Sequence, residues 1–298
     1  MSYCATEVTF PQGITALDTQ IMLCQPHSAG VDVVTDKTPF HPVSHIWPDH
    51  PADRGVLIWQ GNEYLVTACL VGVIEQASGH LYVGNDIPVK RDESGWLFVV
   101  VHRLNSMPPA LKVGESVKLV VDAQYQASLS RGHSAGHLAY LALNKVLAQN
   151  YWRKDADRKD PHGYFDFNSY AQISSFVTPD CSTDLYRLGK TLRKRGLNSD
   201  DVLKDLDLIE GKTLNQQLMQ WLALSSSIQI ECEGTTLTDS RYWVCDLHEG
   251  APARIPCGGT HVNGLEAFRL IKVVLKQVDE QHIEAITYIE PARLEGSF

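Results

Sequence analysis

Two short stretches, far apart in the chain, set the strongest limits on its fold. His133 and His137 lie four residues apart in a run of helix formers. Side chains at this spacing lie one above the other on a helix face, so both imidazoles can face one point. Far downstream, Cys257 and His261 enclose a Gly-Gly-Thr segment whose glycines allow the backbone to fold tightly. Three imidazoles and one thiolate suit zinc, so the sequence predicts one zinc ion per chain, held by these four residues.

A pair of histidines four apart is a weak signal by itself, because the chain has 12 histidines. His41 and His45 have the same spacing, but they lie among prolines where a helix is not expected. We therefore interpret them as histidines of a surface loop. The pair at 133 and 137 is distinguished by the helical run that follows it and by the downstream Cys-Gly-Gly-Thr-His segment.

Composition narrows the class of protein. A hydrophobic content of 44% is usual for a globular chain. No apolar run is long enough to span a membrane, and no secretion signal is visible. Seven scattered cysteines do not form a disulfide framework, so we expect a cytoplasmic protein with reduced thiols. The net charge of −9 argues against a general nucleic-acid binder, and any basic surface must be local.

The pattern of apolar residues changes near residue 126 and predicts two domains in an α+β fold. Residues 1–125 read as short strands bounded by turns, typical of a small β-barrel. Residues 126–298 read as helices and an antiparallel sheet. In this half we expect helices over about 129–150 and 213–224, a helix near 187–196 with Asp184 at its start, and strands over 227–232, 241–245, 267–276 and 282–289.

The combined motif, His-Ser-Ala-Gly-His followed far downstream by Cys-Gly-Gly-Thr-His-Val, resembles the editing domain of alanyl-tRNA synthetase. It resembles still more closely the free-standing alanyl-tRNA editing proteins, called AlaX; threonyl-tRNA synthetases carry a related domain. The resemblance implies a zinc-dependent hydrolase acting in trans, which removes a wrongly attached serine or glycine from tRNA for alanine. His133, His137, Cys257 and His261 would act through the bound zinc. The partner that the resemblance implies is tRNA. No ATP-binding module is evident, so we expect no ATP as a partner, and we expect no membrane.

Candidate substrate residues lie around these motifs. Ser134 stands where most relatives have threonine, and its hydroxyl either contacts the hydroxyl of a bound serine or bonds the backbone. Thr260 has the same two interpretations. Arg193, Lys194 and Arg195 either contact tRNA phosphates or only complement a helix C-terminus.

The loop from Val43 to His50 lacks the glycines and the Gln of the family, and His50 can stand in place of that Gln. Residues 162–167 are similar to a family strand beside the site. Asp246 either orients a ligand histidine or caps a turn.

Two alternatives remain open from the sequence. The altered loop favours a hydrolase of the same fold that acts on another small ester or amide. A non-catalytic, zinc-stabilised tRNA-binding protein would fill every coordination position with protein ligands. The edited amino acid, the tRNA identity and the oligomeric state are not fixed by these residues.

Overall fold

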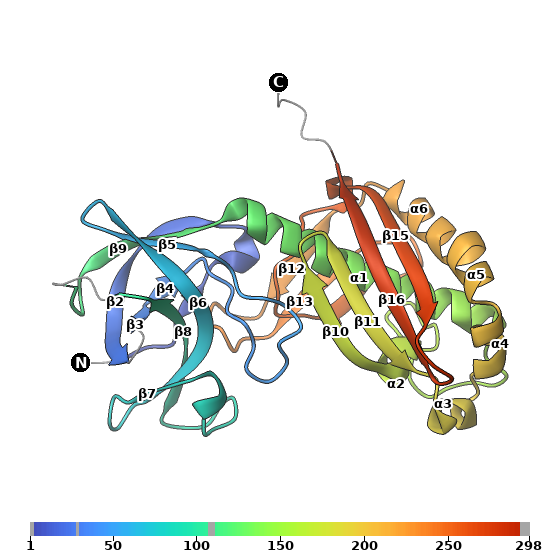
Figure 1. Cartoon of the computed structure of the whole chain (residues 1–298), viewed down its shortest axis with the longest axis horizontal. Helices are drawn as coiled ribbons and strands as arrows, with labels where there is room; N and C mark the ends of the chain where they lie inside the picture. The colour runs from blue at the N-terminus through green and yellow to red at the C-terminus, as the bar shows by residue number, and fades with distance from the viewer. Residues whose placement is uncertain (1–2, 28–29, 107–110, 293–298) are drawn as a thin grey trace. The chain divides into compact units, whose positions relative to one another are not determined.

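The computed structural model describes residues 3–27, 30–106 and 111–292, and the described chain is α+β and rich in sheet (Figure 1). It divides into two compact units. The first comprises Met1–Ala127, Cys232–Arg241 and Gly258–Thr260, and the second comprises Ser128–Glu231, Tyr242–Cys257 and His261–Phe298. The expected domain limits at 1–125 and 126–298 stay a prediction, but two short downstream segments belong to the first compact unit.

The first unit is built on a seven-stranded sheet in the order β5-β9-β2-β3-β8-β6-β7. Strand β5 also pairs with β6, so the pairing of six strands returns to its start. The expected small barrel stays a prediction, which this ring of pairings favours. The strands are β1 (Glu7–Val8), β2 (Ala16–His27), β3 (Gly30–Thr35), β4 (Lys37–Thr38), β5 (Gly55–Trp59), β6 (Asn62–Glu75), β7 (Leu81–Val83), β8 (Trp96–Leu104) and β9 (Ser116–Val121); 3-10 turns span Phe10–Gln12 and Gly84–Asp86.

Strand β8, in the middle of this sheet, contains a continuous run of apolar residues because both of its faces are buried. Val99, Val100 and Val101 are all fully buried. Val100 packs in one hydrophobic cluster, and Val99 and Val101 pack in another. Because successive side chains of a strand point to opposite faces, β8 has apolar packing on both faces.

The second unit combines a four-stranded antiparallel sheet, β10-β11-β16-β15, with a three-stranded sheet, β12-β13-β14. Helices α5 and α6 pack on β15 (Figure 1). The helices are α1 (Ala123–Asn150), α2 (Phe167–Ala171), α3 (Lys190–Arg195), α4 (Ser199–Lys204), α5 (Leu206–Leu208) and α6 (Asn215–Leu222), with a π-helical turn at Ile209–Leu214 and a 3-10 turn at Leu265–Ala267. The strands are β10 (Gln172–Thr178), β11 (Cys181–Arg187), β12 (Ile228–Cys232), β13 (Arg241–Cys245), β14 (Ala253–Pro256), β15 (Phe268–Gln277) and β16 (His282–Pro291).

Helix α1 begins six residues before the expected start at 129. The carboxylate of Asp122 accepts a hydrogen bond of 3.0 Å from the Tyr125 N–H, and this satisfies one of the unpaired donors at the helix start. Within the second unit, α1 contacts both sheets. Gly136 lies beside Ser182 of β11, and the His137 ring lies against Trp243 of β13.

Three expectations for the second unit are wrong in detail. Residues 162–164 form a turn and a bend, Phe165 makes only an isolated bridge to Lys159, and residue 167 begins α2, so no strand spans 162–167. Asp184 does not start a helix: it lies inside β11, where its carboxylate accepts a hydrogen bond from the Gln172 amide. The expected helix over 213–224 begins as the π-helical turn and ends at Leu222.

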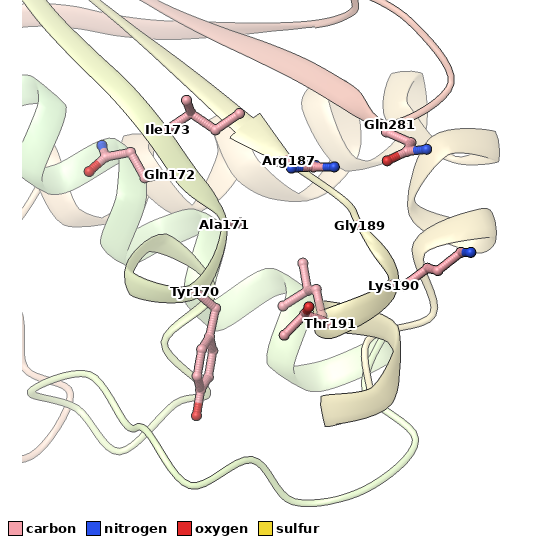
Figure 2. A pocket seen from close by; sticks show the side chains of 10 residues that line it. Tyr170, Ala171, Gln172, Ile173, Arg187, Gly189, Lys190, Thr191 and Gln281 are labelled. Carbon is pink, nitrogen blue, oxygen red and sulfur yellow. The ribbon is translucent and has the colours of Figure 1, made fainter.

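The hairpin β10–β11 was not expected, because β10 carries mostly polar side chains. Strand β10 lies at the edge of its sheet, where polar residues are tolerated on the exposed face. The ends of these strands, α2 and α3 enclose a cavity of about 650 Å³ (Figure 2).

Among the described residues, no helix is long and apolar enough to cross a membrane. The seven cysteines are free, as expected for a chain without a disulfide framework.

Candidate metal centre

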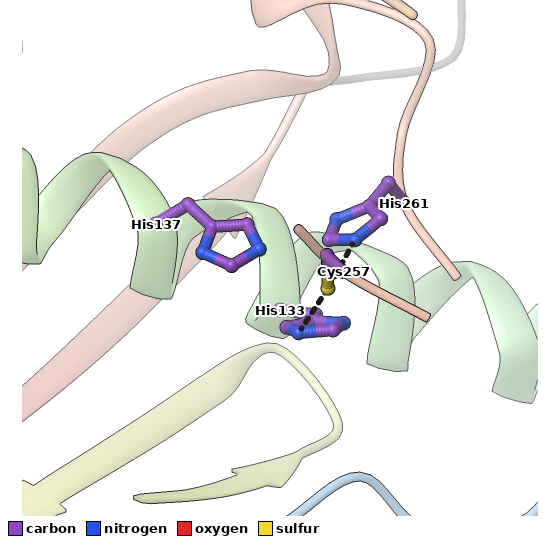
Figure 3. Close-up of side chains that lie close together, drawn as sticks. All are labelled: His133, His137, Cys257 and His261. Atoms are coloured by element: carbon purple, nitrogen blue, oxygen red, sulfur yellow. Dashed lines mark hydrogen bonds between the residues drawn. The ribbon is translucent and has the colours of Figure 1, made fainter. Parts of the chain in front are cut away.

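The second unit brings the four predicted metal ligands together (Figure 3). His133 and His137 lie one turn apart on α1, with ring centroids 5.0 Å from each other. Cys257 follows the end of β14, and His261 lies four residues further along. One ligand atom from each residue lies within 4.8 Å of the other three. The helix spacing and the short segment after β14 therefore converge on one point, as the sequence predicted.

The distances and protonation states fit a bound metal ion. Cys257 Sγ lies 3.3 Å from His133 Nε2 and 3.2 Å from His261 Nε2. A tetrahedral zinc ion separates sulfur and nitrogen ligands by about 3.5 Å. The buried His137 Nε2 has no hydrogen-bond partner in the described chain, which is costly unless it binds a ligand. Burial lowers the pKa of His137 to about 4, so its imidazole is neutral at neutral pH, as metal binding requires.

A buried serine orients one of these ligands. The Ser134 hydroxyl is fully buried and lies 3.0 Å from His261 Nδ1. It also accepts a hydrogen bond of 3.2 Å from the Val262 N–H. When His261 Nε2 binds a metal ion, the ring proton lies on Nδ1, which can then donate a hydrogen bond to the Ser134 oxygen. Such outer partners fix the tautomer and the ring orientation of metal-binding histidines.

Aromatic side chains line the other side of His137. The Trp243 ring is fully buried and lies 5.3 Å from the His137 ring. The Tyr140 ring lies 5.7 Å away in an edge-on contact. These neighbours restrict the His137 ring, and they were not foreseen because Trp243 reads in the sequence only as a core residue of a strand.

Comparison with known proteins finds sequences to which this chain is similar. No family model matches the chain. It is 26% identical over 295 residues to the alanine–tRNA ligase of a Caulobacter species, an alignment that covers 96% of this chain and 28% of the ligase. It is 25% identical over 288 residues to that of Cupriavidus necator, covering 87% of this chain and 29% of the ligase. The ligase of Thermotoga maritima is 27% identical to it over 262 residues, an alignment that covers 86% of this chain and 25% of the ligase.

The chain is related to the alanine–tRNA ligases. It spans less than a third of the length of these relatives, so the similarity concerns one part of a much longer enzyme. Because the alignments extend over most of this chain, they confirm the resemblance that the two motifs indicated.

Two predicted substrate residues bond to each other in the first unit. His50 is buried, and its Nδ1 donates a hydrogen bond of 2.8 Å to the Pro51 carbonyl. In the neutral ring Nε2 is then the acceptor, and it accepts a hydrogen bond of 3.3 Å from the Thr260 hydroxyl. Burial lowers the pKa of His50 to about 4. The substrate-binding roles of Ser134, Thr260 and His50 stay predictions, and each side chain has a partner within the protein.

The loop that carries His41 and His45 differs from its expected surface position. His41 is buried, and its ring lies edge-on to Phe10 and His50 at 5.0 and 4.5 Å. The backbone N–H of His41 donates a hydrogen bond of 2.7 Å to the Asp53 carboxylate. The prolines prevent a helix but allow the loop to fold inward, so the surface interpretation is wrong for His41. Neither His41 nor His45 belongs to a metal-binding group among the described residues.

The remaining predicted residues lie outside the metal centre. Arg193, Lys194 and Arg195 form the last turn of α3. Arg193 lies 3.9 Å from Asp200. Asp246 accepts a hydrogen bond of 2.8 Å from the His248 N–H, so it caps a turn, which was one of its two predicted roles.

Proposed function

We propose that this chain is a zinc-dependent editing hydrolase that acts in trans, in the manner of the AlaX proteins. It would remove serine or glycine that has been wrongly attached to tRNA for alanine, by hydrolysing the aminoacyl ester. One observation carries the proposal: four soft ligands meet within 4.8 Å in a chain related to alanine–tRNA ligases over most of its length. In this proposal the first unit is the small barrel that accompanies the editing domain.

The residues of the centre have separate tasks. Zinc, when bound, would polarise the ester carbonyl and lower the pKa of water. The thiolate of Cys257 and the three neutral imidazoles hold the ion. The Ser134 hydroxyl keeps the proton of His261 on Nδ1 and leaves Nε2 for the metal. An aminoacyl ester is already activated, so positioning of the ester supplies much of the rate.

The first test measures deacylation of seryl-, glycyl- and alanyl-tRNA for alanine, with zinc content determined for each protein. Wild type should release serine or glycine and leave alanine attached. His133→Ala should lose turnover and zinc together, because it removes one ligand. His80→Ala, which changes an exposed histidine of the first unit, is the matched control and should retain both. Unchanged deacylation by a folded His133→Ala protein would sink the proposal.

One observation favours a second candidate, a hydrolase that has diverged to another small ester or amide. The loop that departs from the family exposes Ile46 and Trp47, at 68% and 50%. Large exposed apolar side chains near each other are typical of a contact surface. Turnover of small serine or glycine esters without turnover of any aminoacyl-tRNA would support this candidate. Retained zinc with tRNA binding and no turnover of either substrate would indicate the non-catalytic tRNA-binding protein.

A further inference from the structure

The cavity beside α3 is a second candidate site in the second unit, made of residues outside the metal centre. Segments distant in sequence line it: the end of α2, the start of β10, the end of β11, the start of α3 and the turn before β16. Its polar lining comprises Tyr170, Gln172, Arg187, Lys190, Thr191 and Gln281 (Figure 2). A volume of about 650 Å³ lies within the range of small-molecule sites, so one nucleotide can enter it.

The cavity carries positive charge that the described protein does not neutralise. Arg187 and Lys190 are both exposed. Neither forms an ion pair with a described acidic residue, although other cations of this region, such as Arg193 and Arg195, do. The chain as a whole has a net charge of −9. A local excess of cations in an acidic chain indicates a surface that attracts an anion.

Tyr170 brings two more cations to the same place. The guanidinium of Arg195 lies 4.6 Å from the centre of the Tyr170 ring, and that of Arg158 lies 5.3 Å from it. The Tyr170 hydroxyl also accepts a hydrogen bond of 2.7 Å from the Arg158 N–H. Arg195 also pairs with Asp157 at 3.7 Å, but the Asp157 side chain is 95% exposed, so this pair neutralises the charge of Arg195 only weakly. Two cations therefore line the cavity, and two more lie against Tyr170, one of its lining residues. A polyanion bound there would be attracted by all four charges.

The neutral groups of the cavity indicate which polyanion. The Gln172 amide donates a hydrogen bond to the buried Asp184 and points away from Arg187 and Lys190 (Figure 2), so it shapes the wall of the cavity. Thr191 and Gln281 add a hydroxyl and a second amide. These groups can both donate and accept, which matches ribose hydroxyls and base edges of RNA. A lipid headgroup layer presents phosphates without base edges, and an acidic peptide presents carboxylates and backbone amides but no ribose hydroxyls or bases.

We propose that this cavity binds the sugar–phosphate backbone of an RNA strand, with Arg187 and Lys190 on its phosphates and Thr191 and Gln281 beside the ribose or base. The choice of tRNA as the RNA rests on the proposed function. The cavity is a docking site separate from the reacting ester, so its disruption should weaken tRNA binding and leave the hydrolysis of small esters unchanged.

The test uses the full chain with zinc bound and uncharged tRNA for alanine as the probe. The double variant R187Q and K190Q removes two cations and keeps polar side chains of similar length. The double variant K272Q and K276Q removes two exposed cations of β15 in the same unit and is the matched control. Dissociation constants are measured over a series of salt concentrations, after thermal unfolding and zinc content show that both variants are folded.

The cavity variant should bind tRNA at least about 10-fold more weakly at low salt, and its salt slope should fall by about 1 for each phosphate that the variant no longer neutralises. The control should keep the wild-type slope. An unchanged slope in the cavity variant, or an equal change in the control, would overturn the cavity proposal even if the chain deacylates tRNA. A reduced slope in a chain that deacylates nothing would support the cavity and overturn the editing function. Wild type that binds no tRNA would overturn both.

Discussion

At the residue scale, the buried hydroxyl of Ser134 connects the helix ligands with the downstream ligands of the metal centre. It comes from α1, next to His133, and it bonds both His261 and the backbone of Val262. A single side chain therefore couples the orientation of one imidazole to the position of the segment that carries it. The metal should bind less tightly when this support is removed, even though all four ligands remain.

Replacement of Ser134 by alanine is expected to weaken zinc affinity by about 10- to 100-fold, the usual effect of removing an outer partner of a ligand. Ser134→Thr keeps the hydroxyl and should retain most of the affinity. Zinc affinity is measured by competition with a chelator of known strength. Ser182→Ala is the control, because Ser182 is also buried and its hydroxyl has no partner among the described residues. Wild-type affinity in Ser134→Ala would show that Ser134 does not position His261.

Asp53, in the first unit, is a buried carboxyl group whose titration should change the stability of the protein with pH. One carboxylate oxygen accepts hydrogen bonds from the His41 N–H and the Gln126 amide, at 2.7 and 2.6 Å. The other oxygen has no partner among the described residues. Burial, with a smaller contribution from the charge of Asp122, raises the pKa of Asp53 to about 7. The folded protein therefore favours the protonated acid.

This pKa predicts how Asp53 changes stability with pH. Between about pH 4, where an unfolded Asp titrates, and about pH 7, the folded state binds more protons at Asp53 than the unfolded state. The contribution of Asp53 to the free energy of unfolding therefore falls as pH rises, by on the order of a few kcal/mol. Buried histidines such as His50 have lowered pKa values and act with the opposite sign, so Asp53 must be isolated by substitution.

Asp53→Asn keeps an acceptor for both N–H groups and removes the titration. Its free energy of unfolding relative to wild type should rise from about pH 4 to about pH 7 and then level off. Urea unfolding at about pH 4.5, 6 and 8 measures the difference. Asp18→Asn, at an exposed position of β2, should show no such trend. A difference that does not change with pH would contradict the raised pKa.

At the element scale, α1 has glycines where it approaches the β10–β11 hairpin. A Cβ at Gly132 would lie 2.7 Å from the carbonyl oxygens of Thr178 and Cys181, which belong to the backbone and cannot rotate away. A Cβ at Gly136 would meet only the Ser182 side chain, at 3.1 Å from its hydroxyl oxygen. Both positions are in the helix that carries His133 and His137, so helix packing and ligand placement depend on the same contacts.

Gly132→Ala should destabilise the protein by about 1–3 kcal/mol through overpacking, although alanine is the better helix former by about 1 kcal/mol. Gly136→Ala is the matched control and should be close to neutral or stabilising, because the Ser182 side chain can move. The free energy of unfolding in urea measures both. If the two variants behave alike, close packing of α1 on the hairpin is not what requires glycine at 132.

At the scale of the whole molecule, the two units have separate hydrophobic clusters. The large cluster around α1 and the four-stranded sheet lies in the second unit, together with all four metal ligands. The clusters on the seven-stranded sheet lie in the first unit. Binding of an ion to the folded second unit should therefore stabilise that unit against local unfolding.

Zinc at about 100 times its dissociation constant should raise the free energy of opening of the second unit by about 2.7 kcal/mol. Hydrogen exchange resolves the effect by segment. Amides of α1 and β13 should exchange more slowly with zinc than with a chelator, whereas those of β3 and β8 should not change. Equal protection of both units, or of neither, would contradict a metal site confined to the second unit.

The sequence by itself determined which four side chains form the candidate metal centre, and it determined the α+β class. Spacing of four residues on a helix and the segment from Cys257 to His261 are local properties, so His133, His137, Cys257 and His261 could be named without coordinates. Helix α1 followed from local periodicity except for its first six residues. The strands near 227–232, 241–245, 267–276 and 282–289 agree within two residues at their ends.

Only the tertiary structure decided which neighbours these residues meet. Nothing in the sequence indicated that Ser134 bonds His261, that His41 is buried, or that Asp184 lies in a strand against Gln172. The cavity beside α3 collects side chains from residue 170 to residue 281. Contacts of this kind join residues that are far apart along the chain. Local propensity carries no information about them, because they form only when the packing of whole sheets and helices fixes the distance between them.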